Sequence, residues 1–240
     1  METDHIVKSF DDELNQLHGT IAEMGGLCEQ QLSSAIRSLI KRDAELAEKV
    51  ISKDKKIDQL DDAVESLSLS ILALRQPMAE DLRSVISGLK TASNLERIGD
   101  LAKNIAKRSE ALTHAENIGN APATTIQRMG ELVQGMIKNV IDAYLACDGD
   151  MAEDVRARDE EVDLLHTSLF RELLTYMMEN PGTITTCTHL LFVARNIERM
   201  GDHATNIAEY IHFRVHGHSP PEARQKGDES STMIVEPNGT

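Results

Sequence analysis

Residues 92–108 read ASNLERIGDLAKNIAKR, and residues 194–210 repeat them as ARNIERMGDHATNIAEY. Aligned without a gap, 10 of the 17 positions are identical, and internal agreement of this kind indicates a duplicated structural unit. Both copies contain Glu-Arg-x-Gly-Asp, which places two carboxylates four residues apart. The chain is therefore expected to consist of two similar halves.

The composition favours packed helices. Only 3% of the 240 residues are aromatic and Trp is absent, so Leu, Ile, Val, Ala and ten Met carry the apolar content. Six Pro and fourteen Gly are too few to separate many short strands. The formal net charge of −15 argues against direct nucleic-acid binding and against attraction to anionic lipid. It suits a cation-binding surface, or simply a soluble acidic protein.

The cysteines and the N-terminus indicate a soluble, cytoplasmic protein. Cys28, Cys147 and Cys187 lie far apart with no Cys-x-x-Cys pair, so a zinc knuckle or redox motif is not expected. We expect three reduced, buried thiols. The first residues, METDHIVKSF, resemble neither a signal peptide nor a membrane span.

Apolar residues recur at three- and four-residue spacing along most of the chain, which predicts an all-α fold. Asp43 is a plausible N-cap, and Pro77 suits the first turn of the third helix. The expected architecture is two tandem, pseudo-symmetric three-helix bundles of six long antiparallel helices. The predicted divisions are a first bundle at 5–110, a linker at 111–122, a second bundle at 123–216 and a disordered tail at 217–240.

Each half contains two acid-x-x-x-acid pairs. Residues four apart on a helix lie one turn above each other on the same face, so two such pairs on neighbouring helices would point four carboxylates into a shared groove. In the first half the pairs lie on the second and third helices, and in the second half on the fifth and sixth. The eight acids are Asp54, Asp58, Glu96, Asp100, Asp159, Asp163, Glu198 and Asp202.

Such crowding of like charges is destabilising, and bound cations would neutralise it. Carboxylate oxygens favour hard ions such as Mg²⁺, Mn²⁺, Ca²⁺ or oxidised iron, and His166 and His203 would also admit Zn²⁺. The alternative is a solvated acidic face on which Arg97 and Arg199 form salt bridges. Gly99 and Gly201, inside the repeated helices, are explained by close helix–helix approach.

These motifs resemble those of the PhoU family of phosphate-uptake regulators. The resemblance rests on the two Glu-Arg-x-Gly-Asp segments and the two Asp-x-x-x-Asp pairs. It extends to MGGL at 24–27, RQPMAEDLR at 75–83 and TYMME at 175–179. It covers about residues 5–216. The second half departs from the pattern, because ENPG at 179–182 stands where the first half has the RQPMAEDLR segment.

The resemblance implies two three-helix bundles with multinuclear sites for iron, zinc, magnesium or manganese, and the eight acids above as ligands. Family members are cytoplasmic, often homodimeric, and not enzymes. They link the phosphate ABC transporter, including its ATPase subunit, to a membrane sensor histidine kinase. In doing so they repress the phosphate-starvation response and restrain phosphate uptake when phosphate is plentiful. Such a protein would meet the membrane only through its partners.

Two other classes of protein remain open. A carboxylate-bridged metalloenzyme or metal-storage bundle would use Glu-x-x-His pairs, and none lies beside the acid pairs. A metal-free helical scaffold would need no ligands at all. Near the end of the last helix, His212, His216 and His218 are explained by the helix dipole.

Overall fold

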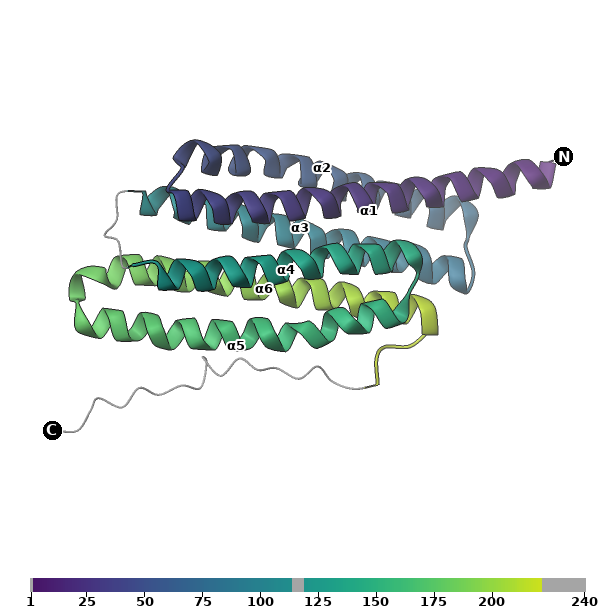
Figure 1. Ribbon diagram of the computed structural model, residues 1–240. Helices are drawn as coiled ribbons and strands as arrows, with labels where there is room; N and C mark the ends of the chain where they lie inside the picture. Colours follow the sequence, from purple (N-terminus) through teal and green to yellow (C-terminus); the bar gives the residue numbers. More distant parts are fainter. Residues whose placement is uncertain (1, 114–118, 222–240) are drawn as a thin grey trace.

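The computed structural model describes residues 2–113 and 119–221, and every regular element in those ranges is helical. The all-α prediction is confirmed. The long helices run back and forth along one axis (Figure 1). They are α1 (Glu2–Lys41), α2 (Ala44–Arg75), α3 (Glu80–Leu112), α4 (Ala121–Ala146), α5 (Gly149–Glu179) and α6 (Ile184–His216), with a short 3₁₀ turn at Pro181–Thr183 before α6.

The six helices form two three-helix bundles. Helices α1, α2 and α3 pack on one another, as do α4, α5 and α6. The bundles meet where α3 lies against α6 and α1 lies against α4, while α2 and α5 lie on the outside (Figure 1). The repeated stretch therefore lies on α3 and α6, which form one of the two helix pairs that join the bundles.

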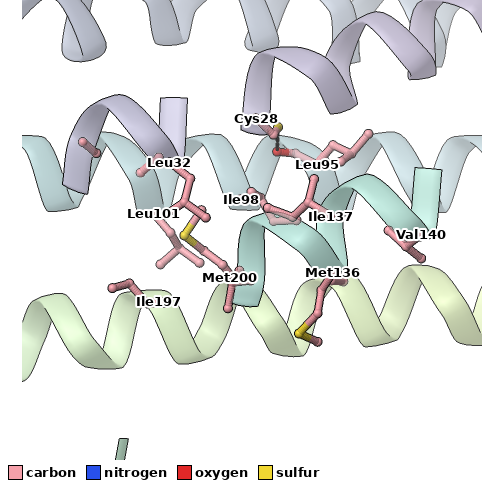
Figure 2. Packing of buried hydrophobic residues seen from close by; sticks show 14 of the residues in the cluster. Cys28, Leu32, Leu95, Ile98, Leu101, Met136, Ile137, Val140, Ile197 and Met200 are labelled. Atoms are coloured by element: carbon pink, nitrogen blue, oxygen red, sulfur yellow. Dashed lines mark hydrogen bonds between the residues drawn. The ribbon is translucent and has the colours of Figure 1, made fainter. Parts of the chain in front are cut away.

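The apolar core continues from one bundle into the other. Figure 2 shows Leu95 and Ile98 of α3 close to Ile137 of α4, with Ile197 and Met200 on the facing α6. All five side chains are fully buried. Because one core serves both bundles, their relative position is fixed by side-chain packing.

A polar network also joins the bundles. Nδ1 of His18 on α1 lies 2.8 Å from Oη of Tyr144 on α4. Nε2 of the same ring lies 3.4 Å from Nη2 of Arg214 on α6. A guanidinium can only donate, so Nε2 accepts and the proton of the neutral ring is on Nδ1. Burial, with the charge of Arg214 adding to it, lowers the pKa of His18 to about 4. The neutral ring therefore connects three helices.

Glycine permits close approach of α1 and α4 at this interface. Helix α1 runs unbroken through Gly25 and Gly26. A Cβ atom at position 25 would lie 2.6 Å from Cγ1 of Ile141 on α4, whereas one at position 26 would meet nothing within 4 Å. Gly25 is therefore needed for α1 to approach α4, and Gly26 is not.

The helix ends follow the expected chemistry except at Pro77. Asp43 accepts a hydrogen bond from Leu46 N at 2.9 Å, as an N-cap should. Pro77 does not start α3, because the chain takes positive φ angles at Gln76 and Ala79 on either side of it. The prediction for Pro77 was wrong, since these two turns delay the helix until residue 80.

The thiols are only partly as expected. Cys28 and Cys187 are buried, and Cys28 donates a hydrogen bond to the carbonyl of Leu95 (Figure 2). Cys147 is exposed, which corrects the prediction of three buried thiols. It is the C-cap of α4 and has a left-handed backbone (φ 54°), so it lies in the turn before α5 and not on a packed face.

The predicted linker and tail lie largely outside the described residues. Helix α3 continues to residue 112 and α4 begins at residue 121, so both extend into the expected linker at 111–122. Residues 114–118 and most of the expected tail, 222–240, are not described. Among the described residues, no helix has the length and apolar character needed to cross a membrane.

Candidate functional site

In the first bundle, acids of α2 and α3 face each other across a close helix contact. Asp54 of α2 is only 3% exposed and lies against Gly99 of α3. A Cβ atom at Gly99 would be 3.3 Å from Asp54 Oδ1 and 2.9 Å from Cδ1 of Ile57. The glycine in the repeated motif therefore makes room for a carboxylate of the neighbouring helix, as close approach requires.

Lys103 of α3 stands between two of the predicted ligands. Its ammonium group donates to Asp54 Oδ2, and also to Asp100 Oδ1 at 2.5 Å. Burial alone would lower the pKa of Lys103, but the hydrogen bonds to the two carboxylates outweigh burial and raise it. Sequence reasoning missed this residue, although its spacing of three from Asp100 allows a salt bridge on a helix.

Asp54 nevertheless remains incompletely compensated. Its Oδ1 atom is buried and has no hydrogen-bond partner among the described residues. Burial raises the pKa of Asp54 in spite of the contact with Lys103, and the nearby charges of Asp58 and Asp100 raise it further. A buried carboxylate oxygen without a donor is the kind of atom that a cation would satisfy.

Further acidic side chains extend this cluster along α2 and α3. Burial raises the pKa of Glu96, and the charges of Asp100 and Asp61 add to this effect. Burial likewise raises the pKa of Asp61, so this acid of α2 belongs to the same cluster. Asp58 is exposed. The four acids predicted in the first half thus gather on adjoining faces of α2 and α3.

The second bundle repeats this arrangement more deeply. Asp159, Asp163 and Glu198 are each at most 4% exposed, and Asp202 is partly buried. A Cβ atom at Gly201 would lie 3.2 Å from Asp159 Oδ1, which matches the Gly99 contact. His166 of α5 is also buried. The structure therefore places the second set of acids on the facing helices α5 and α6, as predicted.

The two bundles differ in the residue at the position of Lys103. The residue equivalent to Lys103 is Thr205, which is buried and donates its hydroxyl hydrogen to the backbone carbonyl of Asp202 at 2.8 Å. Arg195 provides a cation at the edge of the cluster, where it donates to Glu198 Oε1 at 2.9 Å. No lysine thus extends from α6 into the second cluster as Lys103 extends from α3 into the first.

The arginines of the repeat lie at the surface, and its histidine lies between the two bundles. Arg97 approaches Glu96 at 3.5 Å and is mostly exposed, and Arg199 is exposed as well. His203 instead crosses the interface between the bundles, where its Nδ1 lies 2.9 Å from Oδ1 of Asn94 on α3. Asn206 donates to the same oxygen at 3.4 Å. His203 and Asn206 therefore bind Asn94 and join α6 to α3.

The donor set suits a hard cation. Carboxylate oxygens on two facing helices are the ligands that bundle proteins use for such ions, and the unsatisfied oxygen of Asp54 agrees with that chemistry. As placed, no three Asp, Glu, His or Cys side chains of the described residues converge on one point at ligand distance. Metal binding would therefore require side chains of the cluster to rotate toward a common ion.

A comparison with models of protein families identifies the family of this chain. The model of the PhoU domain matches it twice, over residues 21–109 and 126–211, and these two matches correspond to the two bundles. The chain belongs to the PhoU family. The double match also agrees with the internal repeat from which the two halves were predicted.

Individual relatives agree over nearly the whole length. This PhoU-family chain is 49% identical over 226 residues to the phosphate-specific transport system accessory protein PhoU homolog of Caulobacter vibrioides, covering 94% of the chain and 98% of the relative. The crystal structure of PhoU from Pseudomonas aeruginosa has a TM-score of 0.83 and 38% identity, covering 87% of this chain and all of that one. The phosphate transport system regulatory protein PhoU from Streptococcus pneumoniae has a TM-score of 0.82 and 30% identity, with 89% and 100% coverage.

Proposed function

We propose that this chain is a cytoplasmic, homodimeric regulatory adaptor of phosphate uptake. It would connect the ATPase subunit of a phosphate ABC transporter to a sensor histidine kinase and hold the phosphate-starvation response off when phosphate is plentiful. The observation that carries the proposal is membership of the PhoU family across both bundles. Relatives of high identity and coverage are named as accessory or regulatory proteins of phosphate transport.

The architecture suits an adaptor better than a catalyst. Two similar bundles offer two outer helices, α2 and α5, that pack only within their own halves among the described residues. A protein that contacts two partners needs separate surfaces of this kind. The relatives are named as accessory proteins, and we propose that this chain likewise has no enzymatic activity.

Binding between purified components tests the adaptor directly. The full chain should form a complex with the cytoplasmic part of the sensor kinase, and separately with the transporter ATPase subunit, in pull-down and light-scattering measurements. Light scattering of the chain alone also gives its oligomeric state. Failure to bind either partner, in the presence and absence of phosphate, would remove the adaptor proposal.

We further propose that the acid clusters bind metal ions, with the second cluster as the stronger site. In the first cluster the ammonium group of Lys103 already supplies a positive charge between Asp54 and Asp100. In the second, Thr205 stands at the equivalent position, so a bound iron, zinc, magnesium or manganese ion could supply that charge. The ligands would be the four acids of each half, and the ion would connect two helices of one bundle.

Metal analysis of purified protein tests this difference between the clusters. Asp202→Asn should lose more bound metal than Asp100→Asn, and Thr205→Lys should also lose metal because its ammonium group would occupy the second site. Lys103→Thr should gain metal in the first. If all four variants retain the metal content of the parent protein, the clusters are solvated or salt-bridged acidic faces and the metal proposal fails.

A further inference from the structure

Three histidines gather at the end of α6, far from the acid clusters in sequence. The ring centroids of His212 and His216 are 4.4 Å apart, those of His212 and His218 are 5.4 Å apart, and those of His216 and His218 are 6.0 Å apart. With metal–nitrogen distances of about 2.0–2.1 Å, imidazole rings around one ion have centroids roughly 5 Å apart. The three observed separations bracket this value, although the donor atoms of the described residues do not converge on one point as placed.

The backbone at Gly217 creates this cluster. His212 and His216 share a face of α6 because they are four residues apart. A continuing helix would carry His218 about 240° around the axis from His212, away from that face. Instead α6 ends at His216, and Gly217 takes the left-handed conformation (φ 79°), which brings the ring of His218 back to within 5.4 Å of that of His212. Interaction with the helix dipole requires no such gathering.

The hydrogen bonds leave donor nitrogens available. His218 Nδ1 lies 2.9 Å from the carbonyl oxygen of Ser219. A carbonyl can only accept, so Nδ1 carries the proton and Nε2 keeps its lone pair. This contact of Nδ1 with a backbone carbonyl is the one that orients many metal-binding histidines. His212 Nε2 is buried and has no hydrogen-bond partner among the described residues.

The neighbouring helix packs against the ring of His216 and places charged groups of both signs near the cluster. A Cβ atom at Gly149, the first residue of α5, would lie 2.9 Å from His216 Nε2, so only glycine permits this position of the ring. Arg156 of α5 forms salt bridges with Glu153 at 2.7 Å and with Glu209 at 3.8 Å. The cluster therefore lies where α6 meets the start of α5, beside the ion pair of Arg156 with Glu153.

We propose that His212, His216 and His218 form a binding site for a borderline divalent cation such as Zn²⁺, with water as the fourth ligand. Imidazole nitrogen suits this class of ion, whereas the acid clusters present only oxygen and one histidine. Capture requires the exposed rings of His216 and His218 to turn about their side-chain torsions, because the three donor atoms do not yet point to one position. The site would fasten the end of α6 to the turn that follows it, independently of the proposed function.

The test is a Zn²⁺ titration of the full, untagged chain by equilibrium dialysis after chelator treatment. An Asp100→Asn/Asp202→Asn background weakens the carboxylate sites and leaves the histidines intact. In that background we expect one Zn²⁺ per chain to be lost on introducing His212→Gln and His216→Gln together. Removal of the exposed His216 alone should weaken binding about tenfold or more, since even outer-shell changes cost tenfold at metal sites.

His189→Gln serves as the matched control, because His189 lies on the same helix outside the cluster. It should bind Zn²⁺ like the parent protein, and circular dichroism checks that each variant is folded. Zn²⁺ should also shift the ring NMR signals of the three clustered histidines. Unchanged Zn²⁺ binding in the folded histidine variants, or equal loss in His189→Gln, would overturn the proposal.

Discussion

Replacing Lys103 by Met should destabilise the first bundle because it removes the ammonium group that pairs with both Asp54 and Asp100. The side chain of Asp54 is 4% exposed, that of Asp100 34% and that of Lys103 23%. Removing one partner of a fully buried pair costs about 3–5 kcal/mol, whereas exposed pairs contribute about 0–1 kcal/mol. This site lies between these limits, so we expect a loss of about 2–3 kcal/mol in the free energy of unfolding.

The loss should be measured by denaturant and thermal unfolding in buffer containing a chelator. For a chain of this size it corresponds to roughly 4–12 °C in melting temperature. It should be smaller at pH 5 than at pH 8. Burial already raises the pKa of Asp54, and without Lys103 this carboxyl can lower its cost by taking up a proton. A metal ion that binds the acids should restore part of the stability.

Lys107→Met is the matched control, since Lys107 is an exposed lysine one turn further along α3. It should change the free energy of unfolding by no more than about 0.5 kcal/mol. If Lys103→Met behaves like this control at both pH values, the ammonium group of Lys103 does not compensate the first cluster. The second bundle would then need no bound cation in place of this ammonium group.

Three further predictions concern the fold. Gly25→Ala should lower the free energy of unfolding by about 1–2 kcal/mol, because overpacking against the stiff, β-branched Ile141 outweighs the helix propensity of Ala. Gly26→Ala should instead raise it by up to about 1 kcal/mol. Denaturant unfolding compares the two variants, and equal effects would contradict the close contact at Gly25. His18→Gln should flatten the pH dependence of stability. The pKa of His18 is about 4 in the folded chain and 6.5 for an ordinary histidine, so the unfolded chain binds more protons between these pH values. The free energy of unfolding of the parent protein therefore falls by at most about 1.4 kcal/mol per pH unit as the pH drops through this window. Melting temperatures at pH 7 and pH 5 measure this, and an unchanged slope in the variant would count against it. Cys147 should react with a thiol reagent in the native protein within minutes, whereas Cys28, whose pKa is raised by burial, should react only on unfolding; a Cys147→Ser variant that keeps one fast thiol would refute this.

The helices could be predicted because their apolar spacing and caps are local features. The cap at Asp43 depends only on its own side chain and the next turn, and the structure contains it. The turn at Pro77 was mispredicted because Gln76 and Ala79 take positive φ angles, which residues other than glycine adopt rarely and which the local preference of proline does not predict. Cys147 was mispredicted as buried because its exposure depends on where α4 ends.

The approach of the acids to one another could be predicted from helical periodicity, whereas the residue that neutralises their charge could not. Helical periodicity places Asp54 on one face of α2 and Asp100 on one face of α3. Because these two faces are turned toward each other, the packing of the helices brings the acids together. Identifying Lys103 as their counter-ion required knowing how far α2 lies from α3, a distance that Gly99 sets. The cluster at His212 was missed for a similar reason, since it depends on the left-handed turn at Gly217.

Deletion of the chain from its host, followed by measurement of an alkaline-phosphatase reporter at high phosphate, tests the regulatory role most directly. We expect the reporter to be derepressed although phosphate is plentiful, and the full chain supplied from a plasmid to restore repression. A reporter that stays repressed in the deletion strain would contradict the proposed role of this protein as a negative regulator of the phosphate-starvation response.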